Sequence, residues 1–414
     1  MTKAPEVLQS AEVSRSQIPR FSVILPTFNR LRFLRRALLG WERQEPVDLR
    51  FEVIVVDDGS GDGTRDLLSS WTSRRFDYLA LSQQNSGPAL ARNRALERAR
   101  GDFVFFTGDD IVPSPRILAH HVRMHDAVNR ETTVVIGRTR WPEDLPLTAT
   151  MRHVDGAGGE QFSFTCFRDG DEYDFRHFYT ANLSIRRSFL ERVPEGFSVD
   201  FRKAAFEDIE LSYRLSRLGQ RIVYCQDAVA WHYHPYDVRS FFRRQVTCGA
   251  MAHVFYKKWP LLSKWFPVRD VERIRLLEAT ESTGGRRDDS STEALATLEA
   301  ALFELAGLYE GTTGSELTPL LLGIFQYGMV KGFLEASLED PPRSRVQWRL
   351  AREILIPALR GFLLGARKAK LAVPPGLVLR IGELVDDPVI RAWPAAKGPQ
   401  HIPRADDQDR SRSA

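Results

Sequence analysis

The stretch Phe51-Glu-Val-Ile-Val-Val-Asp-Asp-Gly-Ser60 predicts a buried β-strand that ends abruptly in a polar turn. An apolar run rich in β-branched residues is typical of a strand covered on both faces, as strands are in parallel sheets. Aspartate, glycine and serine end the run because they favour turns. The stretch Phe103-Val-Phe-Phe-Thr-Gly-Asp-Asp110 has the same design. Two predicted strands therefore each end in a pair of aspartates.

Strands and helices alternate on both sides of these two stretches. Further strands are predicted at residues 21–25 and 76–81. Apolar residues at helical spacing predict a helix over residues 31–41, and another helix begins at Pro88 and is closed by Gly101. This alternation predicts an α/β fold with a doubly wound, mostly parallel sheet. In such sheets ligands bind beyond the carboxyl ends of the strands, where both aspartate pairs lie.

The pattern changes after residue 236, where helical periods replace the alternation. We therefore expect a flexible lead at residues 1–20, an α/β domain at 21–236, a mainly α-helical accessory domain at 237–399 and a polar tail at 400–414. A polar stretch at residues 280–291 indicates a linker or an exposed loop.

Composition narrows the class of protein. A chain of 414 residues with 43% hydrophobic residues can form two or three domain cores. The net charge of +4 is small and scattered, which argues against a nucleic-acid partner. Three cysteines without a Cys-x-x-Cys pair indicate neither a zinc site nor a disulfide framework, so we expect a reducing, cytoplasmic location. The first 18 residues lack the apolar run of a signal peptide, and the apolar stretch 320–330 is too short to span a bilayer.

Four aspartates at the strand ends predict a site for a divalent cation and phosphate. The four are Asp57, Asp58, Asp109 and Asp110. Neighbouring carboxylates repel one another unless a cation holds them, and Mg²⁺ or Mn²⁺ prefers carboxylate and phosphate ligands. The alternative for either pair alone is that aspartate merely forms a turn after a strand.

Two further motifs carry groups able to bind or to catalyse. Glu207 and Asp208 open a predicted helix, where carboxylates are also ordinary partners of the helix dipole. His232 and His234 lie two residues apart on a predicted strand and therefore point the same way. Such a pair can bind a metal, although two surface histidines are the commoner explanation.

Seven motifs occur in order between residues 21 and 234. They are Val23-Ile-Leu-Pro-Thr-Phe-Asn-Arg30, Val55-Val-Asp-Asp-Gly-Ser60, Asn85-Ser-Gly-Pro-Ala-Leu-Ala-Arg-Asn-Arg94, Phe105-Phe-Thr-Gly-Asp-Asp-Ile-Val-Pro113, Thr180-Ala-Asn-Leu-Ser-Ile-Arg-Arg187 with Glu195-Gly-Phe197, Glu207-Asp208, and His232. In this order they resemble the family 2 glycosyltransferases of the GT-A fold. The resemblance covers about half of the chain and does not extend into the C-terminal half.

The resemblance implies an inverting transfer of a sugar from a nucleotide diphosphate sugar donor to an acceptor hydroxyl, with Mn²⁺ or Mg²⁺ as cofactor. It implies that Asp208 is the catalytic base and that Glu207 supports it or contacts the acceptor. The implied nucleotide-binding residues are Pro26, Thr27, Asn29, Arg30, Asp57, Asp58, Arg92 and Asp109. The implied metal ligands are Asp109, Asp110 and His232, and the implied acceptor or sugar contacts are Asn182 and Trp231. For Arg92 the alternative is a helix-surface ion pair, and for Asn182 and Trp231 it is packing.

One residue departs from the family pattern. Gly108 stands where the family usually has the first aspartate of its Asp-x-Asp motif. Two other functions therefore remain as alternatives, namely a non-catalytic nucleotide- or sugar-binding relative of this fold and a nucleotidyltransferase. The order of the Glu-Asp pair and the downstream histidine favours the glycosyltransferase.

The C-terminal half contains an apolar stripe with basic neighbours at residues 348–370. Such a stripe usually packs on its own domain or on a second copy in a homo-oligomer. It also suits peripheral contact with the inner face of a membrane, which fits a lipid-linked acceptor. A glycan or a small-molecule acceptor is equally compatible with the sequence.

Overall fold

The computed structural model describes residues 5–11, 18–45, 48–156, 158–162, 164–268, 272, 289–312, 315–338, 344–369 and 371–391. The chain forms two compact units. Unit 1 consists of Met1–Leu145 and Phe162–His234, and unit 2 consists of Pro146–Gln161 and Pro235–Ala414. Unit 2 therefore includes residues 146–161, which the sequence assigned to the α/β domain. The predicted polar tail at 400–414 lies outside the described residues.

Unit 1 is built on a mixed, mostly parallel sheet, which confirms the predicted fold class. Ten described strands form it in the order β1-β4-β3-β2-β5-β9-β7-β10-β6, and β8 pairs with β10. Their bounds are β1 Glu6–Ala11, β2 Phe21–Thr27, β3 Phe51–Asp57, β4 Asp77–Ser82, β5 Phe103–Thr107, β6 Ile111–Pro113, β7 Thr133–Arg140, β8 Glu172–Tyr173, β9 Asn182–Arg186 and β10 Arg221–His232. Strands β2 to β5 are parallel, whereas β9 runs antiparallel between β5 and β7.

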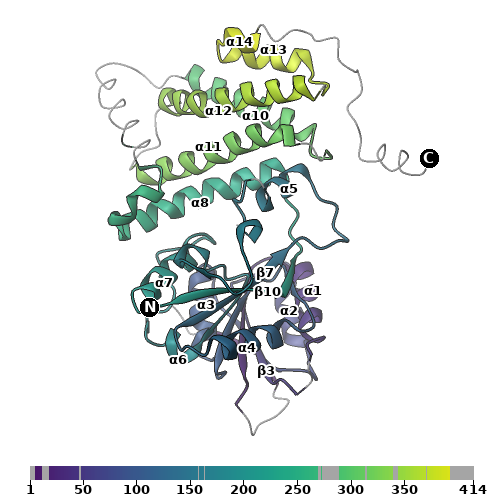
Figure 1. Ribbon diagram of the computed structural model, residues 1–414, viewed down its shortest axis with the longest axis vertical. Coiled ribbons are helices and arrows are strands. Elements are labelled where there is room, and N and C mark those ends of the chain that lie inside the picture. The colour runs from purple at the N-terminus through teal and green to yellow at the C-terminus, as the bar shows by residue number, and fades with distance from the viewer. Residues whose placement is uncertain are drawn as a thin grey trace, which may run out of the picture. The chain divides into compact units, whose positions relative to one another are not determined.

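Helices cover both faces of this sheet (Figure 1). Their bounds are α1 Leu31–Trp41, α2 Thr64–Ser70, α3 Pro88–Leu96, α4 Ile117–Val128, α6 Arg187–Leu190 and α7 Glu207–Ser216, with short 3₁₀ turns η1 Phe164–Cys166 and η2 Phe175–His177. One apolar core joins the sheet to α1, α2 and α4, and a second joins its other face to α3, α6 and α7. Because each strand contributes alternate side chains to the two cores, the central strands are apolar on both faces, as their sequence predicted.

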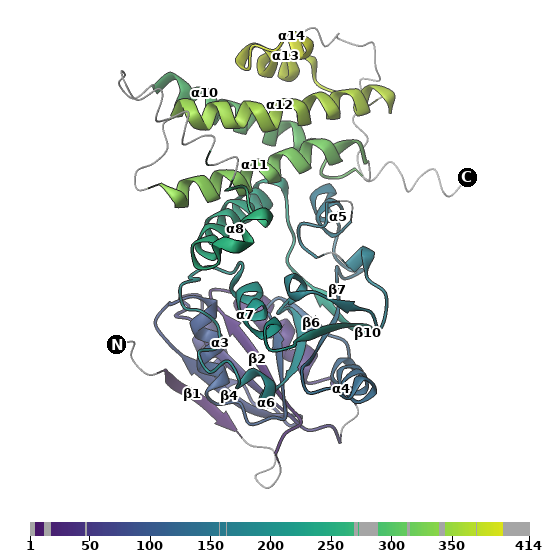
Figure 2. The same ribbon diagram turned by 60° about the vertical axis from the view of Figure 1, so that its left-hand side comes forward.

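Strand β1 differs from the predicted flexible lead. Residues 6–11 pair antiparallel with β4 and extend the edge of the sheet (Figure 2). The ion pair between Arg65 of α2 and Glu6 fastens one end of this strand. No apolar pattern in the sequence indicated β1, because an edge strand is held mainly by backbone hydrogen bonds, which depend little on side-chain type.

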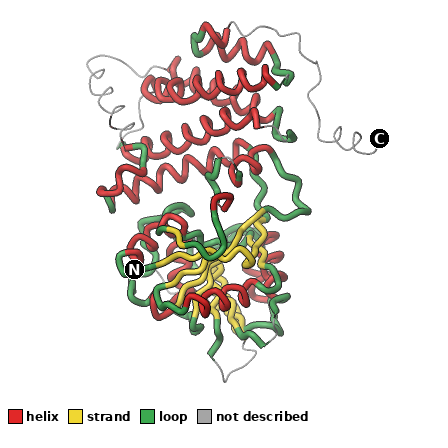
Figure 3. The backbone as a smooth tube through the Cα atoms, in the orientation of Figure 1, coloured by secondary structure: helices red, strands yellow, loops and turns green. Residues whose placement is uncertain are grey.

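The described secondary-structure elements of unit 2 are all helices, joined by loops (Figure 3). Its elements are α5 Ala149–Asp155, α8 Val238–Lys258, η3 Pro260–Trp265, α10 Asp289–Gly307, η4 Ser315–Leu317, α11 Thr318–Ser337, α12 Ser344–Lys368, α13 Pro375–Leu384 and α14 Pro388–Arg391. The predicted linker at 280–291 lies outside the described residues up to residue 288, and α10 begins at Asp289.

Glycines allow α8 and α11 to pack closely. A Cβ added to Gly249 of α8 would lie 2.0 Å from the carbonyl oxygen of Met329, and one added to Gly332 of α11 would lie 1.9 Å from that of Val246. A side chain at either position would therefore force the helix backbones apart. The physical reason for glycine here is close backbone approach rather than a special φ angle.

Helix α11 is longer than the apolar stretch predicted at 320–330. Together with η4 it forms one helical segment, Ser315–Ser337, that is long and apolar enough to cross a membrane by length and composition, and 67% of its most apolar window is buried within the protein. In unit 2 this helix packs against α8 and α12. Its hydrophobicity is therefore used in the core of the helical unit.

Candidate functional site

The turn after β2 is tied to the turn after β3 by side-chain hydrogen bonds. Asn29 adopts a left-handed backbone with φ +53°, a conformation that asparagine tolerates better than most residues. The side-chain oxygen of Asn29 accepts a hydrogen bond from the backbone N–H of Gly61 at 2.8 Å. The backbone N–H of Asn29 donates to Ser60 Oγ at 2.8 Å. Pro26 pairs with Val56 beyond the last β2–β5 pair. These contacts fix the turn at the carboxyl edge of the sheet.

Asp109 follows β5 and is held against the end of β2. Its Oδ2 accepts a hydrogen bond from Thr27 Oγ1 at 2.8 Å, and both side chains are buried. Burial, together with the neighbouring Asp110 carboxylate, raises the pKa of Asp109 to about 7. The predicted nucleotide residue Thr27 and the predicted metal ligand Asp109 are therefore direct partners.

Asp110 lies in a cluster with two histidines and one arginine. Its Oδ2 lies 3.0 Å from His234 Nδ1, 3.5 Å from His232 Nε2 and 3.0 Å from Arg30 Nη1. Arg30 Nη1 also lies 2.6 Å from His234 Nδ1. Burial opposes ionisation of Asp110, but His232, His234 and Arg30 outweigh it and hold the pKa of Asp110 well below its usual value. Asp110 is therefore a carboxylate at neutral pH.

Aromatic rings fix the two histidine rings of this cluster. Trp141 stacks on His232 with ring centroids 4.9 Å apart, and Phe33 stacks on His234 at 6.0 Å. Burial, followed by the charge of Arg30, lowers the pKa of His234, while Asp110 opposes that shift. A neutral imidazole retains a nitrogen lone pair, which is the form that binds metal ions.

The donor set fits a divalent cation. The ligand atoms of Asp110, His232 and His234 all lie within 4.8 Å of one another. One carboxylate and two imidazoles suit a first-row ion such as Mn²⁺ better than Mg²⁺, whose ligands are almost entirely oxygen. His234 was not among the predicted ligands, although its two-residue spacing from His232 had placed both rings on one face.

Asp57 ends β3 and Asp58 follows it, and the two side chains accept hydrogen bonds from different partners. Asp57 accepts hydrogen bonds from the Ser60 amide at 3.0 Å and from Ser82 Oγ at 3.1 Å. Asp58 accepts from the amides of Ser86 and Gly87, each at 2.8 Å, and so fixes the N-terminus of α3. Burial raises the pKa of Asp58 despite these bonds.

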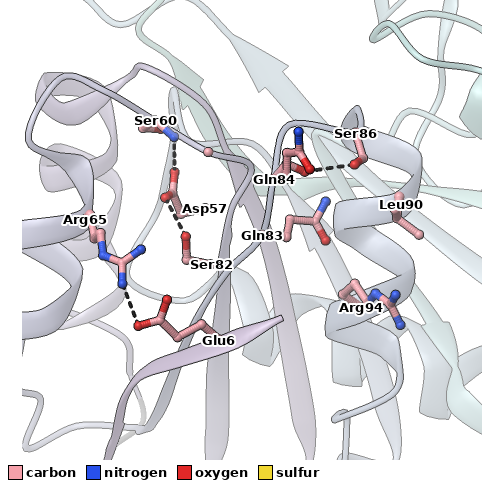
Figure 4. A pocket seen from close by; sticks show the side chains of 11 residues that line it. Glu6, Asp57, Ser60, Arg65, Ser82, Gln83, Gln84, Ser86, Leu90 and Arg94 are labelled. Atoms are coloured by element: carbon pink, nitrogen blue, oxygen red, sulfur yellow. Dashed lines mark hydrogen bonds and ion pairs between the residues drawn. The ribbon is translucent and has the colours of Figure 1, made fainter. Parts of the chain in front are cut away.

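A cavity of about 450 Å³ lies beside Asp57, lined mainly by polar side chains. Figure 4 shows Asp57 between Ser60 and Ser82, with the paired side chains of Arg65 and Glu6 on the same side of the cavity. The complete lining is Glu6, Asp57, Gly59, Ser60, Arg65, Ser82, Gln83, Gln84, Ser86, Leu90 and Arg94. The cavity therefore adjoins the predicted nucleotide residues at β3 but is not lined by the Asp110 cluster.

The predicted catalytic pair begins α7 under backbone strain. Phe206, immediately before Glu207, has φ +65°, which is uncommon for a residue with a Cβ. Arg92 Nη1 lies 2.7 Å from Glu207 Oε1, and the two side chains are only 9% and 4% exposed. Arg92 Nη2 also donates to Thr180 Oγ1 at 3.2 Å. Arg92 therefore forms an ion pair with Glu207 that is buried and not at the helix surface, and its contact with a nucleotide stays a prediction.

Asp208 remains partly exposed beside this pair. Burial and the adjacent Glu207 carboxylate raise the pKa of Asp208 to about 7, although the Arg92 guanidinium opposes the shift. A carboxylate with a pKa near neutrality can exchange a proton under physiological conditions, which suits a general base.

The predicted catalytic pair and the aspartate pairs lie at the same edge of the sheet. Gly87 directly precedes α3, just beyond the carboxyl end of β4, and a Cβ added there would lie 2.7 Å from the carbonyl oxygen of Arg202. The segment before α7 is therefore pressed against the turn that Asp58 holds. Only glycine, here at φ +92°, permits this approach without strain.

Asn182 and Trp231 occupy packing positions. Asn182 on β9 is 1% exposed, its amide oxygen lies 3.0 Å from His121 Nε2, and its amide nitrogen donates to the Ala228 carbonyl at 2.8 Å. Trp231 is half-buried between its neighbours in β10, and its side chain points to the sheet face opposite His232 because side chains alternate along a strand. The hydrogen bonds of Asn182 are those of a buried packing residue, and an acceptor or sugar contact of Asn182 and Trp231 stays a prediction.

Comparison with known proteins gives matches to glycosyltransferases. Residues 22–193 match the profile described as glycosyl transferase family 2. The chain is 30% identical to the uncharacterized glycosyltransferase YfnE of Bacillus subtilis (strain 168) over 264 residues, which cover 53% of this chain and 66% of the relative. It is 28% identical over 338 residues to validoxylamine A glucosyltransferase of Streptomyces hygroscopicus subsp. jinggangensis (strain 5008), covering 73% of this chain and 79% of the relative.

Among solved structures, the chain is similar to the mannosyltransferase PcManGT from Pyrobaculum calidifontis in complex with GDP-Man and Mn²⁺. The TM-score is 0.44 at 18% identity, with 91% of this chain and 84% of that chain covered.

Proposed function

Since this chain belongs to glycosyltransferase family 2 and is a glycosyltransferase, we propose that it moves a sugar from a nucleoside diphosphate sugar to an acceptor hydroxyl with inversion at the anomeric carbon. The observation that carries the proposal is the cluster of Asp110, His232 and His234 at the carboxyl end of β5, the edge of the sheet that also bears Asp208. The cluster suits a divalent cation that is bound to the diphosphate, and Asp208 offers a general base.

The metal site in this proposal is formed by Asp110, His232 and His234. The chemistry that a bound divalent cation supplies is neutralisation of negative charge on diphosphate oxygens. Arg30 already contributes a positive charge beside Asp110 and can contact the same phosphate oxygens. Asp109 is turned toward Thr27, so we assign it to holding the nucleotide turn, with direct metal binding as the weaker role.

Asp208 acts as the general base in this proposal. It accepts the proton of the acceptor hydroxyl as that oxygen forms a bond to the anomeric carbon and the bond to the diphosphate breaks. Glu207 and Arg92 position it, because their buried ion pair fixes the first turn of α7. A single displacement at the anomeric carbon reverses its configuration.

Nucleotide recognition is assigned to the turns after β2 and β3. Thr27, Asn29 and Arg30 line the first turn together with Pro26, and the second carries Asp57 and Asp58. Similarity to a validoxylamine A glucosyltransferase supports glucose-bearing donors as the first to test. The acceptor class is a glycan, a lipid-linked sugar or a small molecule. We further propose a cytoplasmic location, for which the three free cysteines are the support.

Thermal-shift measurements on the full chain test the donor site first. Nucleoside diphosphates and nucleotide sugars are added at millimolar concentration with Mn²⁺, with Mg²⁺ or with chelator. A ligand at one hundred times its Kd stabilises the native state by about 2.7 kcal/mol, so one nucleotide is expected to raise the melting temperature in a metal-dependent way.

Two variants complete the design. Asp110→Asn is expected to abolish the metal-dependent part of the shift. Asp227→Asn removes an exposed carboxylate from β10 and is expected to change nothing. If no nucleotide shifts the melting temperature of the wild-type chain, the proposed donor site is refuted. Transfer to water or an added acceptor, followed by NMR of the anomeric proton, then tests inversion separately.

A further inference from the structure

The turn that follows α8 exposes apolar side chains together with lysines. Helix α8 ends at Lys258, and the short helix η3 spans Pro260–Trp265. Leu261 is 93% exposed and Trp265 is 38% exposed. Lys257, Lys258 and Lys264 are exposed beside them. We call residues 257–265 the α8 turn surface.

The exposure of Leu261 is a consequence of how this turn is anchored. Phe266 packs against Phe255 of α8 with ring centroids 5.4 Å apart and against Phe333 of α11 at 6.5 Å. The turn is therefore pinned at its end by buried aromatic rings, while its middle projects away from the core. A leucine in such a position gains nothing from folding, because burial of apolar surface is what stabilises the folded chain.

Between residues 238 and 268 the charged side chains are all basic, and Asp237 and Asp270 flank this segment in the sequence. From residue 238 to residue 268 the sequence contains six lysines and arginines and no aspartate or glutamate. The whole chain carries a net charge of only +4, so this segment is far more basic than its surroundings. The positive segment is thus complementary to a negatively charged surface.

We propose that the α8 turn surface binds an anionic lipid bilayer, with Leu261 and Trp265 entering the interfacial region and the three lysines contacting lipid headgroups. Tryptophan is favoured at membrane interfaces, and lysines attract anionic lipids within a Debye length of the surface. A second copy of the chain docked through the same surface would bring like charges together, because a two-fold contact places each lysine group against its own equivalent.

The apolar stripe of α12, which the sequence offered for membrane contact, is occupied within unit 2. Leu355, Leu359 and Phe362 on that stripe are buried. Arg360 forms an ion pair with Asp387, and Arg349 lies 3.5 Å from Glu353. The basic charge of α12 is therefore partly neutralised and its apolar face is covered, whereas Leu261 of the α8 turn surface is exposed.

Vesicle flotation with the purified full chain tests this proposal. The vesicles contain phosphatidylcholine alone or with about one third phosphatidylglycerol, and no donor or acceptor is needed. We expect at least tenfold stronger binding to the anionic vesicles, and weaker binding in high salt. Leu261→Asp is expected to reduce binding at least tenfold, and Lys257→Ser with Lys258→Ser by about 25-fold, taking about fivefold for each lysine.

The matched control is Leu364→Asp, which adds the same charge at an exposed leucine of α12. We expect it to bind within twofold of the wild type, and unchanged circular dichroism shows that each variant is folded. The proposal is overturned if the wild type does not bind anionic vesicles, if Leu364→Asp loses binding as strongly as Leu261→Asp, or if Leu261→Asp changes only the oligomeric state. The last outcome would assign the surface to a second copy. Because vesicle binding is measured without nucleotide, its failure is distinct from failure of the donor-site test.

Discussion

Replacing Asp208 by asparagine should stabilise the protein at alkaline pH while it removes activity. Burial and the Glu207 carboxylate raise the pKa of Asp208 from 3.8 to about 7. Between these values the folded protein keeps a proton that the unfolded chain has released. The wild type therefore loses stability as the pH rises through this interval, and the full cost applies above about pH 7. The asparagine side chain of the Asp208→Asn variant would carry no charge and would not incur that cost.

The size of the effect follows from the same shift. A carboxyl group whose pKa is raised from 3.8 to about 7 is harder to ionise by about 4 kcal/mol, taking 1.36 kcal/mol for each pH unit. Solvent reaches this partly exposed side chain and reduces the cost to about 1–3 kcal/mol. Roughly two thirds of this free-energy cost accrues between pH 5 and pH 8.5, because most of the interval between the two pKa values lies above pH 5. Over that range we expect Asp208→Asn to gain about 1–2 kcal/mol relative to the wild type.

Urea denaturation of the full chain, followed by tryptophan fluorescence at pH 5 and pH 8.5, measures this difference. Asp227→Asn, which removes an exposed carboxylate, should follow the pH dependence of the wild type. The same Asp208→Asn protein should bind the donor normally but transfer sugar at least about 100-fold more slowly, as expected for loss of a general base. An identical pH dependence in wild type and Asp208→Asn would refute the electrostatic reasoning, and full transfer activity would refute the assignment of the base.

Three further predictions concern other contacts. Arg92→Met should destabilise unit 1 by about 3–5 kcal/mol in urea denaturation, because it leaves the buried Glu207 carboxylate without its cation. The same variant should move the acid limb of the pH–rate profile to higher pH, because Arg92 lowers the pKa of Asp208. His234→Ala should weaken Mn²⁺ binding at least tenfold in electron paramagnetic resonance titrations, and unchanged binding would remove this residue from the metal site. Gly249→Val should lower the melting temperature of the chain by several degrees because its Cβ would overlap a carbonyl oxygen of α11, and a neutral effect would contradict the close packing of α8 and α11.

Local sequence patterns determined the elements of the α/β unit. The apolar runs at 51–56 and 103–106 became the buried strands β3 and β5, because a strand covered on both faces needs apolar side chains at successive positions. The aspartates that follow them lie at the carboxyl edge of the sheet for the same reason, since a turn must begin where the apolar run ends. The mainly helical character expected after residue 236 also followed from periodicity, and the family followed from motif order.

The tertiary structure alone decided which of these charged groups meet. Asp109 and Asp110 are adjacent in sequence, yet one bonds Thr27 and the other faces two histidines and Arg30. Adjacent side chains at a strand end leave the backbone in different directions, and their partners come from segments 80 residues or more away in the sequence.

The sequence also did not determine the partner of Arg92. Its position in the predicted helix indicated a charged side chain but not the residue that it contacts. Its pairing with Glu207 joins residues 115 positions apart and depends on how α7 packs against α3. Strand β1 and the projecting Leu261 also had no signal of their own. Backbone pairing at a sheet edge and exposure at a turn are set by the surrounding fold, whereas sequence periodicity reports only which face of each element is apolar.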